Sequence, residues 1–204
     1  MGTCYIIGAG ECNSLDFIKE EKDVIICADG GLKYAEKYGY IPDCIVGDFD
    51  SYGSTPSSLK NVIVLPKEKD ETDSFYAVKM GFELGFEEFR LYGMLGGRID
   101  HTLANIQLMM YIVDNGGNAV LIGNDYDVYL IKNGMFMFNG PKGKYISVFS
   151  YSPKSEGVTI KGLKYEVNNI SFTNNNPLGV SNEFIGEIAT VEVREGVLLV
   201  AVEK

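Results

Sequence analysis

Residues 24–31 read VIICADGG, an apolar run that ends in an aspartate and two glycines. The run Val24–Ala28 carries no charged side chain on either face, which is typical of a strand buried on both faces. Leu32, Ala35 and Tyr38 then follow at the spacing of one helical face. The stretch therefore predicts a strand that passes directly into a helix, which is the repeating unit of a parallel sheet.

The same alternation recurs through the first half of the chain. Further strands are expected where short apolar runs end near glycine, proline or aspartate, at Tyr5–Gly8, Cys44–Gly47, Val62–Leu65, Phe89–Gly93 and Ala119–Gly123. Because apolar residues recur between them with helical spacing, helices are expected over Leu32–Tyr38, Asp73–Leu84 and Thr102–Val113. We predict an α/β domain with a mostly parallel sheet flanked by helices on both faces.

The second half has a different rhythm from about Gly134 onward. Strands separated by turns are expected at Phe136–Phe138, Tyr145–Ser150, Val158–Lys161, Tyr165–Val167, Ile188–Arg194 and Val197–Glu203. No helix is expected among them, so this half is predicted to form a smaller all-β sandwich or barrel domain. The boundary is expected near residues 124–135, which gives an α/β domain over 1–130 and a β-rich domain over 131–204.

The composition is typical of a globular protein. Of the 204 residues, 46% are hydrophobic and 23% are charged, and the formal net charge is −10. Proteins that bind duplex nucleic acid usually carry a basic stripe, and none is visible, so nucleic acid is not an expected partner. No apolar run reaches the length of a membrane-spanning helix, so no membrane association is expected.

The cysteines and the first residues indicate a reducing compartment. Cys4, Cys12, Cys27 and Cys44 show no CxxC spacing, so buried free thiols are expected. The first residues lack the basic region and long apolar run of a signal peptide. A cytoplasmic location is therefore expected.

Aspartates gather just past the ends of four expected strands. They are Asp29, Asp48, Asp50, Asp70, Asp73 and Asp100. Ligands of open parallel sheets bind at the carboxyl ends of the strands. Two like charges about 4 Å apart repel by about 4 kcal/mol at an effective dielectric of about 20, so a cation has to compensate. Because hard oxygen ligands favour Mg²⁺ or Ca²⁺, the pattern predicts a magnesium-dependent phosphate-transfer site.

Basic residues and glycines in the same loops agree with phosphate chemistry. Lys67, Lys69 and Arg98 can neutralise a polyphosphate. Gly30-Gly31 and Gly96-Gly97 stand at expected helix starts, where backbone amides can approach a phosphate closely.

Plainer interpretations exist for single residues. Thr72 and Asp100 are equally suited to capping a helix, but capping alone does not require a pair such as Asp48 and Asp50. His101, the one histidine, is favoured as a solvated residue of a first helical turn over a role near phosphate.

Known nucleotide motifs are missing or weak. The chain has no GxxxxGK[ST] motif, which excludes a Walker-type kinase. Gly8-Ala9-Gly10 imitates a dinucleotide fingerprint, but Asn13 stands where its last glycine would be, so a tight turn is favoured.

Several short motifs occur in one order along essentially the whole chain. They are ADGG at 28–31, PD at 42–43, GDFDS at 47–51, KDETD at 69–73, GGRIDH at 96–101 and SNE at 181–183. Together they make the chain resemble the thiamine pyrophosphokinase family. The resemblance implies an α/β catalytic domain, a C-terminal β domain, and a homodimer that binds thiamine between its subunits. It also implies that the diphosphate of ATP moves to the hydroxyethyl oxygen of thiamine, releasing AMP, with Mg²⁺ as cofactor.

The resemblance also distributes roles by motif position. The metal carboxylates would be Asp48, Asp50 and Asp73. The nucleotide and phosphate site would contain Asp29, Gly30, Gly31, Lys69, Thr72, Arg98 and Asp100, whereas Asp70 only shapes its loop. Catalytic roles are expected for Asp50, Asp73, Asp100 and Arg98.

Thiamine recognition is expected from the β domain. By motif position, Ser181 and Asn182 would meet the thiamine aminopyrimidine. Family members often carry Trp where Leu163-Lys164-Tyr165 stands, and this chain has no Trp. Tyr165 can stack on a cationic ligand or simply pack within a strand.

The hypothesised reaction is in-line attack of the thiamine hydroxyl on the β-phosphorus of ATP. Arg98 and Lys69 would stabilise the developing charge, and either Asp73 or Asp100 would accept the hydroxyl proton. Two alternatives stay open: a magnesium-dependent nucleoside triphosphate hydrolase, and a non-catalytic module that binds nucleotide or thiamine.

Overall fold

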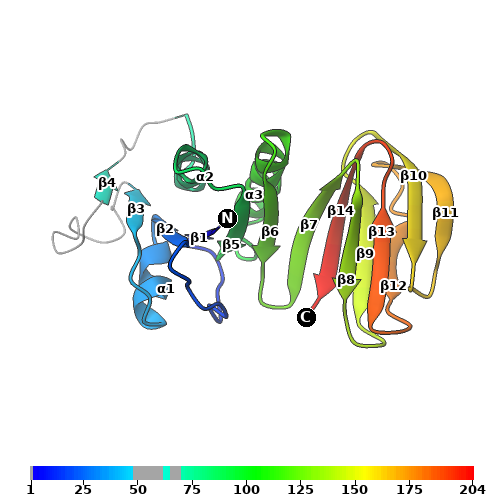
Figure 1. Ribbon diagram of the computed structural model, residues 1–204, viewed down its shortest axis with the longest axis horizontal. Coiled ribbons are helices and arrows are strands. Elements are labelled where there is room, and N and C mark those ends of the chain that lie inside the picture. The colour runs from blue at the N-terminus through cyan, green and yellow to red at the C-terminus, as the bar shows by residue number, and fades with distance from the viewer. Residues whose placement is uncertain (1, 48–61, 65–69) are drawn as a thin grey trace. The chain divides into compact units, whose positions relative to one another are not determined.

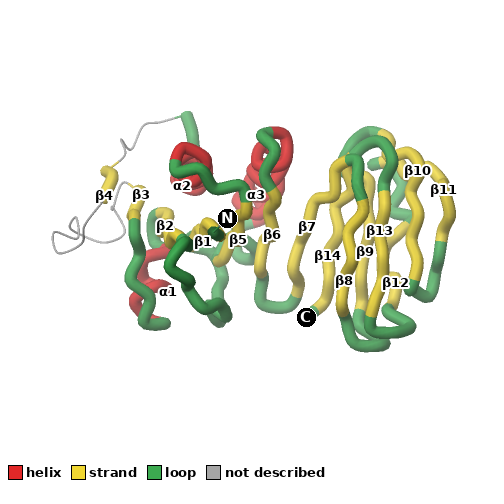
Figure 2. Tube along the Cα trace, in the orientation of Figure 1, coloured by secondary structure: helices red, strands yellow, loops and turns green. Residues whose placement is uncertain are grey.

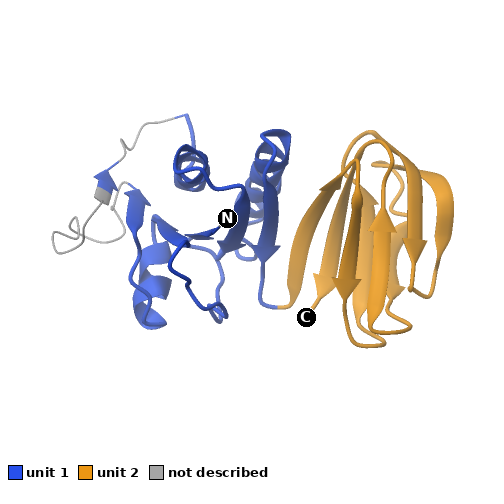
Figure 3. Ribbon diagram, viewed as in Figure 1, with its two compact units in different colours: residues 1–124 blue, residues 125–204 orange. Residues whose placement is uncertain are grey.

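The computed structural model describes residues 2–47, 62–64 and 70–204. The chain divides into two compact units, Met1–Asn124 and Asp125–Lys204 (Figure 3). Each unit has a hydrophobic core of its own. Of the residues expected at the site, Asp48, Asp50 and Lys69 lie outside the described residues.

The first unit is built on parallel strands in the order β6-β5-β1-β2-β3-β4 (Figure 2). They are β1 Thr3–Ile7, β2 Val24–Ala28, β3 Cys44–Gly47, β4 Val62–Val64, β5 Glu88–Tyr92 and β6 Asn118–Ile122. Because each neighbouring pair is parallel, all their carboxyl ends lie at one edge. The order reverses at β1, with β2 on one side and β5 on the other, and such a reversal opens a crevice for ligands at that edge.

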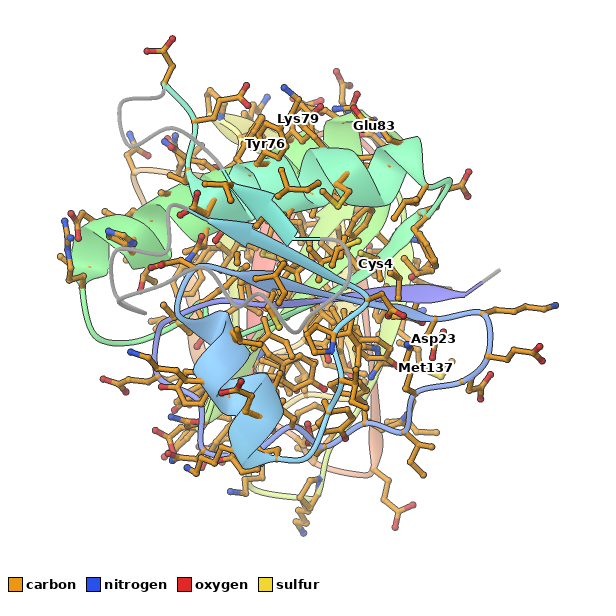
Figure 4. The ribbon with its side chains drawn as sticks, turned by 90° about the vertical axis from the view of Figure 1, so that its left-hand side faces the viewer. Cys4, Asp23, Tyr76, Lys79, Glu83 and Met137 are labelled. Carbon is orange, nitrogen blue, oxygen red and sulfur yellow. The ribbon has the colours of Figure 1, made fainter. Side chains whose placement is uncertain are left out.

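The described part of the chain contains three helices, and they cover both faces of these strands. They are α1 Gly31–Lys37, α2 Asp73–Glu83 and α3 Ile99–Asp114. α1 lies on one face, and α2 and α3 lie on the opposite face (Figures 1 and 4). None of the described helices is both long enough and apolar enough to span a membrane.

Helix α2 shows how its sequence separates a buried side from an exposed one. Ala77 and Val78 are fully buried. Tyr76, Lys79 and Glu83 project from the side that faces away from the strands (Figure 4). This amphipathic pattern is what fixes the helix on the sheet, since burial of its apolar side supplies most of its stability.

Strand β1 is covered on both faces, which explains its apolar sequence. The pleat sends Tyr5 and Ile7 to the side of α1, where they join Leu32 in one buried cluster. On the other side, the Sγ of Cys4 lies only 3.0 Å from where a Cβ would stand on Gly81 of α2. A polar side chain on either face would therefore be buried without solvent.

The second unit consists of antiparallel strands that enclose one core. Its strands are β7 Tyr126–Lys132, β8 Met135–Asn139, β9 Tyr145–Ser150, β10 Lys154–Lys161, β11 Val167–Thr173, β12 Gly179–Glu183, β13 Ile188–Glu192 and β14 Val197–Glu203. They pair in the orders β12-β9-β14-β7 and β11-β10-β13-β8. Side chains from both sets share the core, among them Ile146, Val148, Val158, Ile160, Val191 and Leu198.

Two features differ from the expectations. Over the whole chain, some strand pairs are parallel and others are antiparallel. The expected mostly parallel sheet therefore describes the first unit alone. In addition, no strand was expected where β7 and β12 lie. β12 reads GVSNE, which lacks apolar alternation, and it is held by pairing with β9 rather than by local propensity.

Candidate active site

A cavity of about 640 Å³ lies in the first unit, at the carboxyl edge of its strands. Its walls come from the segment after β1, the end of β2, helix α1, the segment before α2, the loop after β5 and the start of α3. The cavity therefore opens where the strand order reverses, which is the usual ligand position in an open α/β sheet.

Four of the expected site residues line this cavity together. They are Asp29, Thr72, Asp73 and Arg98. Although these residues are far apart in the chain, the parallel strands β2 and β5 and the helix α2 bring them to one place. Arg98 is the one Lys or Arg among the described residues that line the cavity.

Asp29 stands directly after β2 in an uncommon backbone conformation. Its φ is 49°, in the left-handed region that few residues other than glycine adopt. Its amide donates to the carbonyl of Val46 at 2.8 Å, which extends the pairing with β3 by one residue. This conformation turns the chain out of the strand at a point where Asp29 lines the cavity.

Thr72 and Asp73 form the start of α2. The Oγ1 of Thr72 accepts from the amide of Phe75 at 3.2 Å, so Thr72 caps the helix. Asp73 lies in the first turn, where a negative charge is favoured by the helix dipole. The capping interpretation of Thr72 is therefore confirmed, and the same residue also lines the cavity.

Arg98 and Asp100 form an exposed ion pair at the start of α3. The Nε of Arg98 lies 3.2 Å from Oδ1 of Asp100, and its Nη2 lies 2.5 Å from Oδ2. This hydrogen-bonded pairing lowers the pKa of Asp100 and raises the pKa of Arg98. Asp100 also accepts from the amide of His101 at 3.0 Å. Asp100 is not among the residues that line the cavity, and its link to the cavity is the ion pair with Arg98, which does line it.

Gly30 and Gly31 have a packing role in the structure. A Cβ on Gly31 would lie 1.9 Å from the carbonyl oxygen of Ile7, so α1 can approach β1 only with glycine here. Neither Gly30 nor Gly31 is among the lining residues, whereas Gly96 and Gly97 are.

The carboxylates that line the cavity are of the chemical type that binds magnesium ions. Glu11, Asp29, Glu71 and Asp73 offer the oxygen ligands that Mg²⁺ prefers. Among the described residues, no group of three or more acidic, histidine or cysteine side chains converges closely enough to hold a metal. Two expected ligands, Asp48 and Asp50, lie outside those residues, and Asp70 is exposed and outside the lining.

Sequence reasoning missed several lining residues. Glu11 follows Gly8-Ala9-Gly10, and its position after β1 at the same edge was the available signal. Glu71 pairs with Lys79 at 3.2 Å. Asn105, one turn after His101 on α3, donates to the carbonyl of Met94 at 2.8 Å. His101, expected to be solvated, is exposed and also lines the cavity.

The residues expected to meet thiamine lie together in the second unit. Asn182 is 4% exposed, and its side chain holds the backbone of Tyr165: Oδ1 accepts from the Tyr165 amide at 2.9 Å and Nδ2 donates to its carbonyl at 2.8 Å. Tyr165 is 61% exposed, and the Nζ of Lys164 lies 5.6 Å from the centroid of its ring. Ser181 is exposed, with a φ of 55°.

Comparison with known proteins matches both units. The model of the thiamin pyrophosphokinase catalytic domain matches residues 15–121, and that of the thiamin pyrophosphokinase vitamin B1 binding domain matches residues 135–198. The chain is 29% identical to a thiamine pyrophosphokinase of Bacillus subtilis (strain 168) over 208 residues, covering 98% of this chain and 97% of the relative.

Solved structures of similar proteins have the same fold. The crystal structure of thiamine pyrophosphokinase from Bacillus subtilis superimposes with a TM-score of 0.88 at 27% identity, covering 99% of both chains. That of thiamin pyrophosphokinase from Geobacillus thermodenitrificans gives a TM-score of 0.85 at 25% identity, covering 99% of this chain and 97% of the other.

Proposed function

The chain belongs to the thiamin pyrophosphokinase family, and we propose that it transfers the diphosphate of ATP to the hydroxyethyl oxygen of thiamine. The products are thiamine diphosphate and AMP. The observation that carries this proposal is one cavity in which Asp29, Asp73 and Arg98 meet at the edge where the strand order reverses. A polyphosphate needs a cation there, and an alcohol nucleophile needs a nearby base.

In the proposed reaction, the thiamine hydroxyl oxygen attacks the β-phosphorus of ATP from the side opposite the oxygen that bridges the α- and β-phosphates. The new bond joins the hydroxyethyl oxygen to the β-phosphorus, and the bond from that phosphorus to the bridging oxygen breaks. AMP leaves with the bridging oxygen. Arg98 stabilises the charge that develops on the phosphoryl oxygens.

Asp73 is the better candidate for accepting the hydroxyl proton. It lines the cavity, whereas Asp100 does not. The ion pair with Arg98 lowers the pKa of Asp100, which makes that carboxylate a weaker base. Of the two alternatives that the sequence leaves open, the structure therefore supports Asp73.

Mg²⁺ would be held by Asp48, Asp50 and Asp73 and, when bound, would neutralise phosphate charge. The carboxylates that line the cavity support this assignment by their oxygen chemistry. Asp29 and Thr72 would contact the nucleotide on the same edge. Gly30, Gly31 and Lys69 stay part of the proposed nucleotide site by motif position only.

The decisive test is one incubation with ATP, Mg²⁺ and thiamine, with products separated by chromatography. We expect AMP and thiamine diphosphate in equal amounts, and no product after chelation of Mg²⁺. ADP in place of AMP would contradict diphosphate transfer. ATP consumption at the same rate without thiamine would identify a nucleoside triphosphate hydrolase, and binding without product would identify a non-catalytic module.

Tyr165 is proposed as the aromatic platform for the thiazolium or pyrimidine ring, with Ser181 beside it. Its exposed ring already faces the Lys164 ammonium, so it is accessible to a cation. Replacing Tyr165 with alanine is expected to raise KM for thiamine about tenfold, because a desolvated cation–π contact contributes about 1–2 kcal/mol. Tyr165→Phe, which keeps the ring, should stay within about threefold of the parent.

This prediction is checked by measuring initial rates against thiamine and, separately, against ATP. An unchanged KM for thiamine in Tyr165→Ala would remove Tyr165 from the thiamine site. A matching rise in KM for ATP would instead indicate a general loss of structure.

A homodimer and a cytoplasmic location complete the proposal. Exposed apolar side chains on β8, including Met135 and Met137, support an interface between copies. No disulfide joins the four cysteines, all of which the structure describes, and this agrees with a reducing compartment.

A further inference from the structure

The loop Gly93–Arg98 carries Arg98, yet its own sequence gives it little rigidity. Gly96 and Gly97 have φ values of 81° and 64°, in the left-handed region, and consecutive glycines have wide backbone freedom. Arg98 is 72% exposed on its side chain, so packing does not fix it. A loop of this kind needs contacts from outside if it is to hold a guanidinium within about 1 Å of its working position.

One end of the loop is held by the segment after β1 and by α3. The amide of Gly10 donates to the carbonyl of Gly93 at 2.7 Å. The Nδ2 of Asn105 donates to the carbonyl of Met94 at 2.8 Å. The start of the loop is therefore fixed on both sides.

The other end is held by Glu11. The Oε1 of Glu11 accepts from the amide of Gly97 at 3.0 Å, immediately before Arg98. Its carboxylate also fills the space beside Gly96, where a Cβ would lie 2.7 Å from Oε2. A bond from an amide to a carboxylate is stronger than one to a neutral oxygen.

We propose that Glu11 is a positioning residue that holds Gly96 and Gly97 so that Arg98 faces the cavity. The expected change in kinetics rests on the proposed function, whereas the contact between Glu11 and Gly97 does not. Glu11 lies outside the residues matched by the catalytic-domain family model, which begins at residue 15. None of the motifs that carry the family resemblance includes Glu11.

Because Glu11 is negatively charged, its replacement separates a bracing role from simple repulsion of ATP. A carboxylate beside a polyphosphate opposes binding unless it binds a cation or has a structural task, and a carboxylate that served only to bind a cation would lose as much in Glu11→Gln as in Glu11→Ala. If Glu11 only repelled ATP, its removal would lower KM for ATP. If it braces the loop, its removal displaces Arg98 and weakens ATP binding and catalysis.

The test compares Glu11→Ala with Glu11→Gln, with Glu21→Ala as a control. Gln keeps an acceptor oxygen for Gly97, whereas Ala removes it. Glu21 is an exposed glutamate of the same connection between β1 and β2, so its replacement makes the same change in charge. We expect Glu11→Ala to lower kcat/KM for ATP about 10- to 100-fold with KM for thiamine unchanged, and Glu11→Gln to restore most of the loss.

Hydrogen exchange measured by mass spectrometry without substrates gives a readout independent of activity. Peptides covering residues 94–100 should exchange faster in Glu11→Ala than in the parent and near the parent rate in Glu11→Gln and Glu21→Ala. Unchanged exchange in Glu11→Ala, a lower KM for ATP in that variant, or equal damage in Glu11→Gln would each overturn the proposal. Faster exchange in a chain that shows no diphosphate transfer would refute the proposed function and leave the brace standing.

Discussion

Arg98→Ala is expected to lower kcat for thiamine diphosphate formation by about 10²- to 10³-fold, the loss typical of removing one group that stabilises transition-state charge. Arg98 is the one Lys or Arg that lines the cavity within the described part of the chain. Lys69, which is expected to share its task on the transferring phosphoryl oxygens, lies outside the described residues. Steady-state rates with saturating ATP and thiamine measure the effect.

Arg98→Lys is the matched control, because it keeps the charge and loses the planar fork. We expect Arg98→Lys to have a kcat between those of the parent and of Arg98→Ala. A rise in KM for ATP with kcat unchanged would mean that Arg98 binds ground state and transition state equally. Activity of Arg98→Ala within about threefold of the parent would remove Arg98 from the chemistry altogether.

Arg98→Ala should also change the titration of Asp100. Arg98 holds the pKa of this exposed carboxyl below its ordinary value. In Arg98→Ala the Asp100 pKa should therefore rise, as followed by carboxyl-carbon nuclear magnetic resonance during an acid titration. The lowered pKa stabilises the fold above the unfolded pKa of the carboxyl, and this contribution is lost as pH falls through the folded pKa.

Gly31→Ala is expected to destabilise the first unit by about 3 kcal/mol, the upper end of the usual range for overpacking. The new Cβ would lie 1.9 Å from the carbonyl oxygen of Ile7, which belongs to β1 at the middle of the sheet. A backbone group cannot move aside as a flexible side chain can. The gain in helix propensity from glycine to alanine, about 1 kcal/mol, is too small to offset this clash.

Gly30→Ala serves as the control, since its Cβ would meet the Cβ of Ala9 at 3.1 Å and the Cα of Ala9 at 3.9 Å, with no backbone oxygen close to it. Urea unfolding followed by the helix signal of circular dichroism reports on the first unit, because the described helices all lie there. If Gly31 served only to let a phosphate approach, Gly31→Ala would unfold at the parent's urea concentration and show a raised KM for ATP. That outcome would contradict the packing role.

Much of the site could be predicted from local sequence. Apolar runs identified strands such as β2 and β5, and strands that end at one edge bring their following residues together. Asp29 and Arg98 were therefore expected at the cavity that they do line. The half-exposed strand β12 escaped prediction because its stability comes from pairing with β9 rather than from its own pattern.

Local pattern, read with the order of the motifs, was sufficient for the succession of strands and helices in the first unit, for the acids at the strand ends and for the family. The tertiary structure alone decided what individual side chains touch. Glu11 meets Gly97 across 86 residues of chain, and Asn182 holds Tyr165 across 17. Such contacts depend on where the sheets place distant segments, and no periodicity within one segment encodes them. For the same reason, Gly31 could be recognised as a packing residue only when α1 was seen lying against β1.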